Sequence, residues 1–81
     1  MTFPMKRGER MARQMLQNVR TAGLRVRFLK IDSEWAIEML NPKPLTDEEL
    51  RAATDLTMFA IGYPRNFGTL VRLHEEQGVG Q

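Results

Sequence analysis

GLRVRFLKIDSEWAIEML, from Gly23 to Leu40, is the stretch that decides the fold of this chain. Apolar and polar residues alternate on both sides of Asp32-Ser33, as expected for two half-buried β-strands joined by a tight turn. With Asp32-Ser33 as a two-residue turn, Phe28 lies opposite Ile37 and Val26 opposite Met39, and both pairs fall on the same side. A loop one residue longer would set Phe28 against Glu38 and break this pattern. The stretch therefore predicts an antiparallel β-hairpin and its register.

The same register separates an inner from an outer face. On the inner face Phe28 and Trp35 point inward together, and Lys30 lies opposite Trp35, where a cation–π contact can form. On the outer face Arg27 lies opposite Glu38, a cross-strand pair worth roughly 0.2–1 kcal/mol. The outer face as a whole mixes charged with apolar side chains: Arg25, Arg27, Leu29, Glu38 and Leu40. Such a mixture is typical of a surface that binds another protein. The alternative is that the chain's own third helix, or a second subunit, covers this face.

A helix is predicted before the hairpin, over residues 9–22. Its apolar residues recur at helical spacing, and Gly23 stands where a C-terminal glycine cap belongs. Its outer face is basic and carries Arg10, Arg13 and Arg20. We expect this basic face to adjoin the hairpin and to share in binding a partner.

Two helices are predicted after the hairpin. Thr46 with Glu49 forms a capping box, and Leu45 with Leu50 forms the matching hydrophobic staple, which marks a helix start. The buried stripe of this second helix is predicted to contain Leu50, Ala53, Leu56, Thr57, Ala60 and Ile61. A turn over residues 63–66 then leads to a third helix, whose apolar side is marked by Phe67, Leu70, Val71 and His74.

The expected fold class is therefore α+β: a helix, a two-stranded antiparallel β-hairpin and two helices (αββαα). We expect one domain over residues 9–77. Residues 1–8, with Pro4 and Gly8 as helix breakers, and residues 78–81 are expected to be flexible ends.

Composition limits what can stabilise a chain of 81 residues, which is a single small domain. There is no cysteine and one histidine, so disulfides are excluded and a structural zinc site is disfavoured. Self-association is the remaining common means of stabilising so small a fold, and we predict a homodimer. Twelve basic against ten acidic residues give a net charge of +2, which does not call for a polyanionic partner.

The sequence shows neither a signal peptide nor a membrane span. The N-terminus lacks the apolar run of a signal peptide, and no segment approaches the ~20 apolar residues of a membrane span. Together with the lack of cysteine, this favours the cytoplasm and argues against a membrane partner.

No residue pattern points to catalysis. Asp47, Glu48 and Glu49 are explained as the acidic start of a helix, where negative charge is favourable. His74 has no neighbouring cysteine or serine that would make it part of a nucleophilic site. Phosphate-binding loops, dinucleotide fingerprints and metal-ligand spacings are missing. We therefore predict that the protein is not an enzyme and uses no cofactor or metal.

Several pieces of the chain together match a known pattern. They are Met15-Leu16, Ala22-Gly23-Leu24, residues 35–40, and Leu45-Thr46 followed by Glu49-Leu50. Over about residues 11–75 this order resembles the N-terminal docking domain of the tubulysin synthetase (TubC-like) family. The resemblance implies an αββαα fold, a homodimer, and a hairpin that receives a short segment of a partner protein. It also implies that Arg25 and Arg27 receive an acidic partner segment. Two features depart from the family: the longer link Gly62-Tyr63-Pro64, and an end at Gln81 with no synthase module behind it.

These observations favour a non-catalytic protein–protein interaction module that binds through its hairpin and basic helix. It would act as a docking or adaptor domain or as a small stand-alone protein. The alternative is a phage-encoded inhibitor that sequesters a host regulator, motor or defence protein. The chain reads as complete at both ends, which favours this alternative.

A small nucleic-acid-binding protein is the third reading. The basic helix face offers arginines to phosphates but lacks interleaved aromatic residues that stack on bases. The last two helices faintly resemble a helix-turn-helix, but Arg72 there is offset by Glu75 and Glu76. We therefore expect the partner to be another protein.

Overall fold

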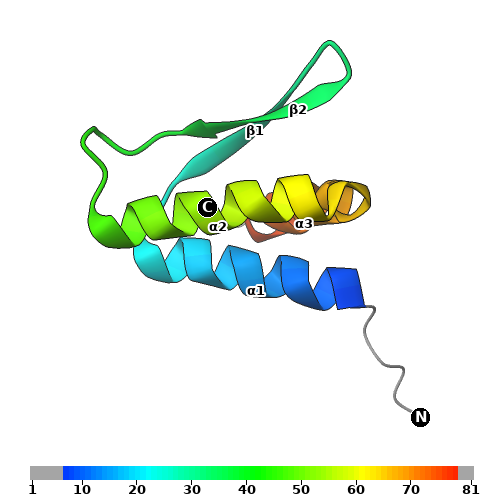
Figure 1. Ribbon diagram of the computed structural model, residues 1–81, viewed down its shortest axis with the longest axis horizontal. Helices are drawn as coiled ribbons and strands as arrows, with labels where there is room; N and C mark the ends of the chain where they lie inside the picture. The colour runs from blue at the N-terminus through cyan, green and yellow to red at the C-terminus, as the bar shows by residue number, and fades with distance from the viewer. Residues whose placement is uncertain (1–6, 79–81) are drawn as a thin grey trace.

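The computed structural model describes residues 7–78. Its elements are α1 (Arg7–Ala22), β1 (Val26–Ile31), β2 (Glu34–Met39), α2 (Asp47–Gly62) and α3 (Pro64–Gly78). The predicted α+β fold and its αββαα order are confirmed. The helices pack against one another, and the hairpin lies over one side of them and rises away toward its tip (Figure 1). Residues 1–6 and 79–81, predicted to be flexible, lie outside the described residues.

The hairpin has the predicted register. Phe28 pairs with Ile37, Arg27 with Glu38 and Lys30 with Trp35. Asp32 and Ser33 form the turn, with φ of 51° and 69°. Positive φ at both central residues is what a type I′ turn requires, and this turn matches the right-handed twist of the strands.

Helix α1 is joined to β1 by a glycine cap. Gly23 has φ of 76°, a conformation that glycine adopts without steric cost. Its N–H donates to the Arg20 carbonyl, and the Leu24 N–H donates to the Val19 carbonyl, each at 3.0 Å. This is the Schellman pattern, in which carbonyl groups at the helix end gain hydrogen-bond partners and the residues on either side of the cap form an apolar contact. Val19 and Leu24 are both buried, so the cap also aims β1 at the core.

The start of α1 differs from the prediction. Gly8 was expected to break the helix, but it lies within the first turn of α1. A Cβ at this position would collide with the side chain of Asn66 in α3. Gly8 is therefore a point of close approach between two helices rather than a stop.

The start of α2 is as predicted. The Thr46 side chain accepts a hydrogen bond from the Glu49 N–H at 3.1 Å, and the Glu49 carboxylate accepts one from the Thr46 N–H at 2.9 Å. This capping box satisfies N–H groups that the first turn of a helix leaves without partners. The acidic first turn also lies at the positive end of the helix dipole.

The buried side of α2 was predicted wrongly in part. The buried residues are Ala52, Ala53, Leu56 and Phe59. Leu50 is 56% exposed and Ile61 is 71% exposed, and Thr57 is also on the surface. The helix has apolar residues on two sides, and helical spacing alone does not tell which side meets α1 and α3.

Helix α3 begins three residues earlier than predicted. Residues 63–66 were expected to form a turn, but the helix starts at Pro64. Proline suits the first helical position because its missing N–H has no partner there anyway. The predicted apolar side is confirmed, with Phe67, Leu70 and Val71 buried and Leu73 added to them.

The inner face of the hairpin rests on α3. The Phe28 ring lies edge-on to those of Phe67 and His74, with centroid distances of 5.5 and 4.9 Å. Trp35 lies 6.0 Å from Phe67, and the Lys30 ammonium stands 5.2 Å from the Trp35 ring centroid, as predicted. Phe28 and Trp35 therefore point inward together, which turns the arginine-bearing face outward.

Candidate partner-binding surface

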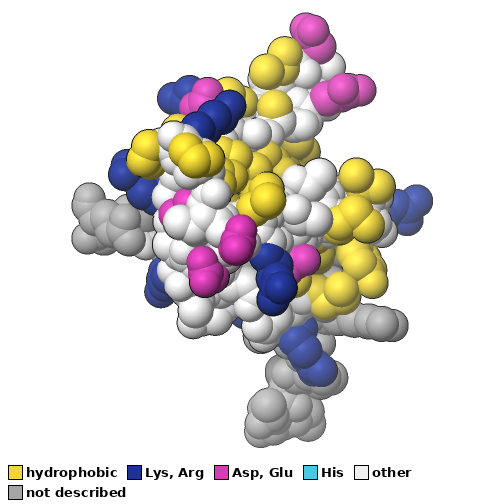
Figure 2. All heavy atoms as spheres, turned by 60° about the vertical axis from the view of Figure 1, so that its left-hand side comes forward, with side chains coloured by type: hydrophobic (Ala, Val, Ile, Leu, Met, Phe, Trp, Pro, Cys, Tyr) yellow, Lys and Arg dark blue, Asp and Glu magenta, His cyan; other side chains and the backbone are white. Residues whose placement is uncertain are grey.

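The outer face of the hairpin is open to solvent. Arg27 and Glu38 form the predicted ion pair at 2.8 Å, with side chains 59% and 43% exposed. Leu29 is half-buried opposite Ala36, whereas Ile31 near the tip is 56% exposed. Basic, acidic and hydrophobic side chains lie close together on the hairpin side of the molecule (Figure 2). Helix α3 packs on the opposite face, so the alternative in which the third helix covers the arginines is wrong.

A groove of about 510 Å³ opens at the base of the hairpin. It lies between the ends of α1 and α3 and the start of β1. Its apolar lining comes from Leu16, Val19, Leu24, Val26 and Leu40, and its polar lining from Arg20, Arg25, His74 and Gln77. Arg25 and Leu40 share the outward parity of Arg27 and Glu38 in the strands. The groove and the outer face therefore form one continuous surface.

The groove combines an apolar lining with positive charge at its edges. Arg20 donates to the Gln77 side chain at 3.3 Å, which links α1 to α3 beside the groove. Arg25 is exposed. Burial lowers the pKa of His74 below its usual 6.5, and the neighbouring Glu75 carboxylate opposes this only in part. This shift favours the neutral imidazole, and Arg20 and Arg25 bring two guanidinium groups to the edges of the groove.

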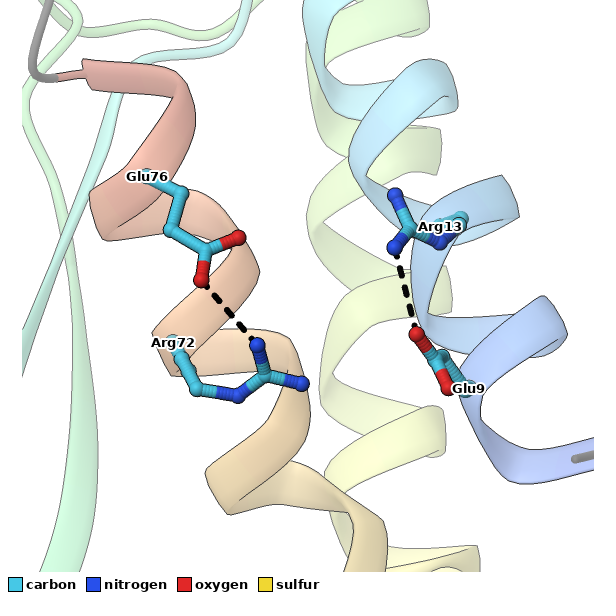
Figure 3. A network of polar contacts seen from close by, with 4 residues as sticks. All are labelled: Glu9, Arg13, Arg72 and Glu76. Atoms are coloured by element: carbon cyan, nitrogen blue, oxygen red, sulfur yellow. Dashed lines mark hydrogen bonds and ion pairs between the residues drawn. The ribbon is translucent and has the colours of Figure 1, made fainter. Parts of the chain in front are cut away.

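The remaining arginines of the basic helix lie farther away. Arg13 and Arg10 precede Arg20 on α1 by seven and ten residues, which places them about 10 and 15 Å along the helix axis. Arg13 donates to the Glu9 carboxylate at 3.1 Å, and on α3 Arg72 donates to Glu76 at 3.0 Å (Figure 3). The fold brings Arg20, Arg25 and Leu40 together, but not Arg10 and Arg13 with them.

Asn41 supports the base of this surface, and sequence reasoning missed it. Its amide oxygen accepts a hydrogen bond from the Arg25 N–H at 2.6 Å. Its amide nitrogen donates to the Gly23 carbonyl at 3.0 Å and to the Glu49 carboxylate at 3.1 Å. One side chain thus ties the start of β1 to the first turn of α2. Its partners lie 16, 18 and 8 residues away in sequence, so no local pattern marks it.

Three further features were sought among residues 7–78: a metal cluster, a second hollow and a membrane-spanning helix. There, no group of three or more histidine or acidic side chains is arranged to hold a metal ion. A second hollow of about 470 Å³ between α1 and α2 has Asp47, Glu48 and Asp55 in its lining, but the first two belong to the acidic helix start. Within the same residues no helix has both the length and the apolar character to cross a membrane.

Comparisons of the chain with protein-family models, with curated proteins and with solved structures gave no match.

Proposed function

We propose that this protein is a non-catalytic interaction module that binds an extended, acidic and partly apolar segment of another protein. The segment would lie along the outer face of the hairpin and enter the groove at its base. The module would act in the cytoplasm as a docking domain, adaptor or small inhibitor. The observation that carries the proposal is the continuity of Arg20, Arg25 and Leu40 with the outer face of the hairpin.

The chemistry of the surface supports an acidic and apolar ligand. A partner carboxylate beside Arg20 or Arg25 forms a charge-assisted hydrogen bond, which is stronger than a neutral one. Next to them, Leu40 is 43% exposed and offers an apolar contact at the mouth of the groove. Within residues 7–78 the two strands pair only with each other, so an edge of the hairpin can also accept a further strand.

The same observations weigh against nucleic acid as the partner. Arg13 and Arg72 are engaged by carboxylates one helical turn away, and such pairing reduces the positive field that phosphates would meet. Near the hairpin, the Phe28 ring packs edge-on against the buried Phe67 ring, so neither of these two rings is free to stack on bases.

Selection of binding peptides from a random library tests the proposal. We expect the enriched peptides to combine acidic with apolar residues. We expect the double variant Arg25→Glu/Arg27→Glu to weaken binding of a synthetic enriched peptide at least about tenfold, because the acidic residues of the peptide would then meet negative charge at two positions of the outer face. Fluorescence anisotropy measures the affinity, and circular dichroism checks the fold.

A matched control separates local recognition from overall charge. The double variant Arg51→Glu/Arg72→Glu changes the net charge by the same amount on exposed helix positions, and it should bind the peptide nearly as well as the original chain. Equal losses in both double variants would reject the hairpin as the binding site. Salt-sensitive binding of a DNA or RNA duplex that is lost in Arg10→Glu/Arg13→Glu would establish the nucleic-acid reading instead.

A further inference from the structure

Helix α2 carries a second apolar face that no part of the described chain covers. Opposite its buried residues lies a stripe formed by Leu50, Thr54, Thr57, Met58 and Ile61, here called the outer stripe of α2. Its three large members are 56%, 62% and 71% exposed. Besides the hydrophobic side chains on the hairpin side, Figure 2 shows a separate group of exposed hydrophobic side chains at the right of the view.

The polar members of the outer stripe need no external partner. The Thr54 hydroxyl donates to the Leu50 carbonyl, and the Thr57 hydroxyl donates to the Ala53 carbonyl, both at 2.9 Å. Charged residues of this stretch, Arg51 and Asp55, project to the flank of the stripe at 100° per residue. The outer stripe is therefore uncharged from Leu50 to Ile61, a length of about 17 Å along the axis.

We propose that the outer stripe of α2 binds a second copy of this chain, with the two α2 helices antiparallel about a twofold axis near Thr54 and Thr57. In this arrangement Leu50 of one copy faces Ile61 of the other, and the small threonines at the centre let the backbones approach. The contact is isologous and closes at two copies.

Charge at the two ends of the outer stripe favours a second copy in this orientation. Asp47 stands before Leu50, and Arg65 stands just past the end of α2. Antiparallel pairing brings the acidic end of each copy to the basic end of the other, and it also opposes the two helix dipoles. Parallel pairing would set Asp47 and Glu48 against the same residues. The charges at the two ends of the outer stripe therefore complement those of a second, antiparallel copy. An unrelated partner would carry this charge pattern only by chance.

Sedimentation velocity over a concentration series, on the full chain, tests this assignment. We expect the original chain to dimerise and Ile61→Glu to sediment as a monomer with unchanged helical circular dichroism, because this side chain is already exposed. Ile31→Glu places the same charge at an exposed apolar position on the hairpin and should leave the dimer intact.

A charge exchange gives an independent readout. Asp47→Arg and Arg65→Asp should each raise the dimer dissociation constant about fivefold, the effect of two symmetry-related surface ion pairs. The double variant Asp47→Arg/Arg65→Asp should restore it. A monomeric original chain, an intact Ile61→Glu dimer, a dimer lost in Ile31→Glu, or a double variant that fails to recover would each overturn the proposal. The outer stripe shares no residue with the hairpin surface, so the peptide-binding result stands or falls separately.

Discussion

Ser33 is the residue whose conformation fits its side chain least well. It has φ of 69° in the hairpin turn, a region that costs most L-residues roughly 1–2 kcal/mol. Its neighbour Asp32 also has positive φ, but aspartate tolerates this region better because its short side chain can bond locally. The type I′ geometry is held by the strands on both sides, whose register admits only a two-residue turn.

Replacing Ser33 by glycine should therefore stabilise the protein. Relief of the positive φ outweighs the added backbone entropy of glycine in the unfolded chain, so we expect a net gain of about 0.5–1 kcal/mol. Urea unfolding at one protein concentration measures it. Ser33→Ala keeps the strain and should give no gain. A Ser33→Gly variant no more stable than Ser33→Ala would show that the turn carries no strain.

At the scale of elements, the hairpin could be predicted fully and the helices only in part. Strand parity leaves no choice of register, since a slip of one residue would bury Glu38. The capping box at Thr46 could be predicted equally well, because all its partners lie within one helical turn. The buried side of α2 could not be predicted, since Leu50 and Ile61 have the spacing of core residues and only the positions of α1 and α3 show that they are exposed. Pro64 was read as part of a turn, although proline also begins helices.

In the candidate site, too, features that depend on residues close in sequence could be predicted, and features that depend on residues distant in sequence could not. The outward position of Arg25, Arg27 and Leu40 follows from alternation within the strands. The groove does not, because its walls come from α1 and α3, which only the tertiary fold brings together. Asn41 and His74 gain their roles through contacts with distant residues, and no local pattern marks them.

Asn41 links the start of β1 to the first turn of α2, and its replacement should destabilise both elements. Asn41→Ala removes three hydrogen bonds and leaves the Arg25 N–H and Gly23 carbonyl without their partner. We expect a loss of about 1–3 kcal/mol in unfolding free energy, measured by urea unfolding. Asn18→Ala is the matched control, since Asn18 accepts only a side-chain bond from Gln14 on the same helix. Equal stability of both variants would mean that the link is dispensable.

At the scale of the whole molecule, burial is unevenly shared between helices and hairpin. Leu56 and Leu70 are fully buried in the helical layer. Along the hairpin, exposure rises from 6% at Val26 to 56% at Ile31, and Trp35 is 41% exposed. Few apolar contacts hold the tip, and regions of this kind open at lower free energy than a core. A surface that opens easily can adjust to a bound segment.

Hydrogen exchange should therefore divide the molecule into two units. We expect the strand amides of residues 29–36 to exchange at least about tenfold faster than α3 amides around Leu70, because the tip opens without unfolding the helices. Phe28→Ala removes the contacts that this ring makes with Phe67 and His74, and it should accelerate the hairpin amides most. Leu70→Ala creates a cavity in the shared core and should accelerate all protected amides alike. Uniform exchange in the original chain, or uniform acceleration by Phe28→Ala, would show instead that the hairpin and the helices open as one cooperative unit. The binding surface would then be as rigid as the core.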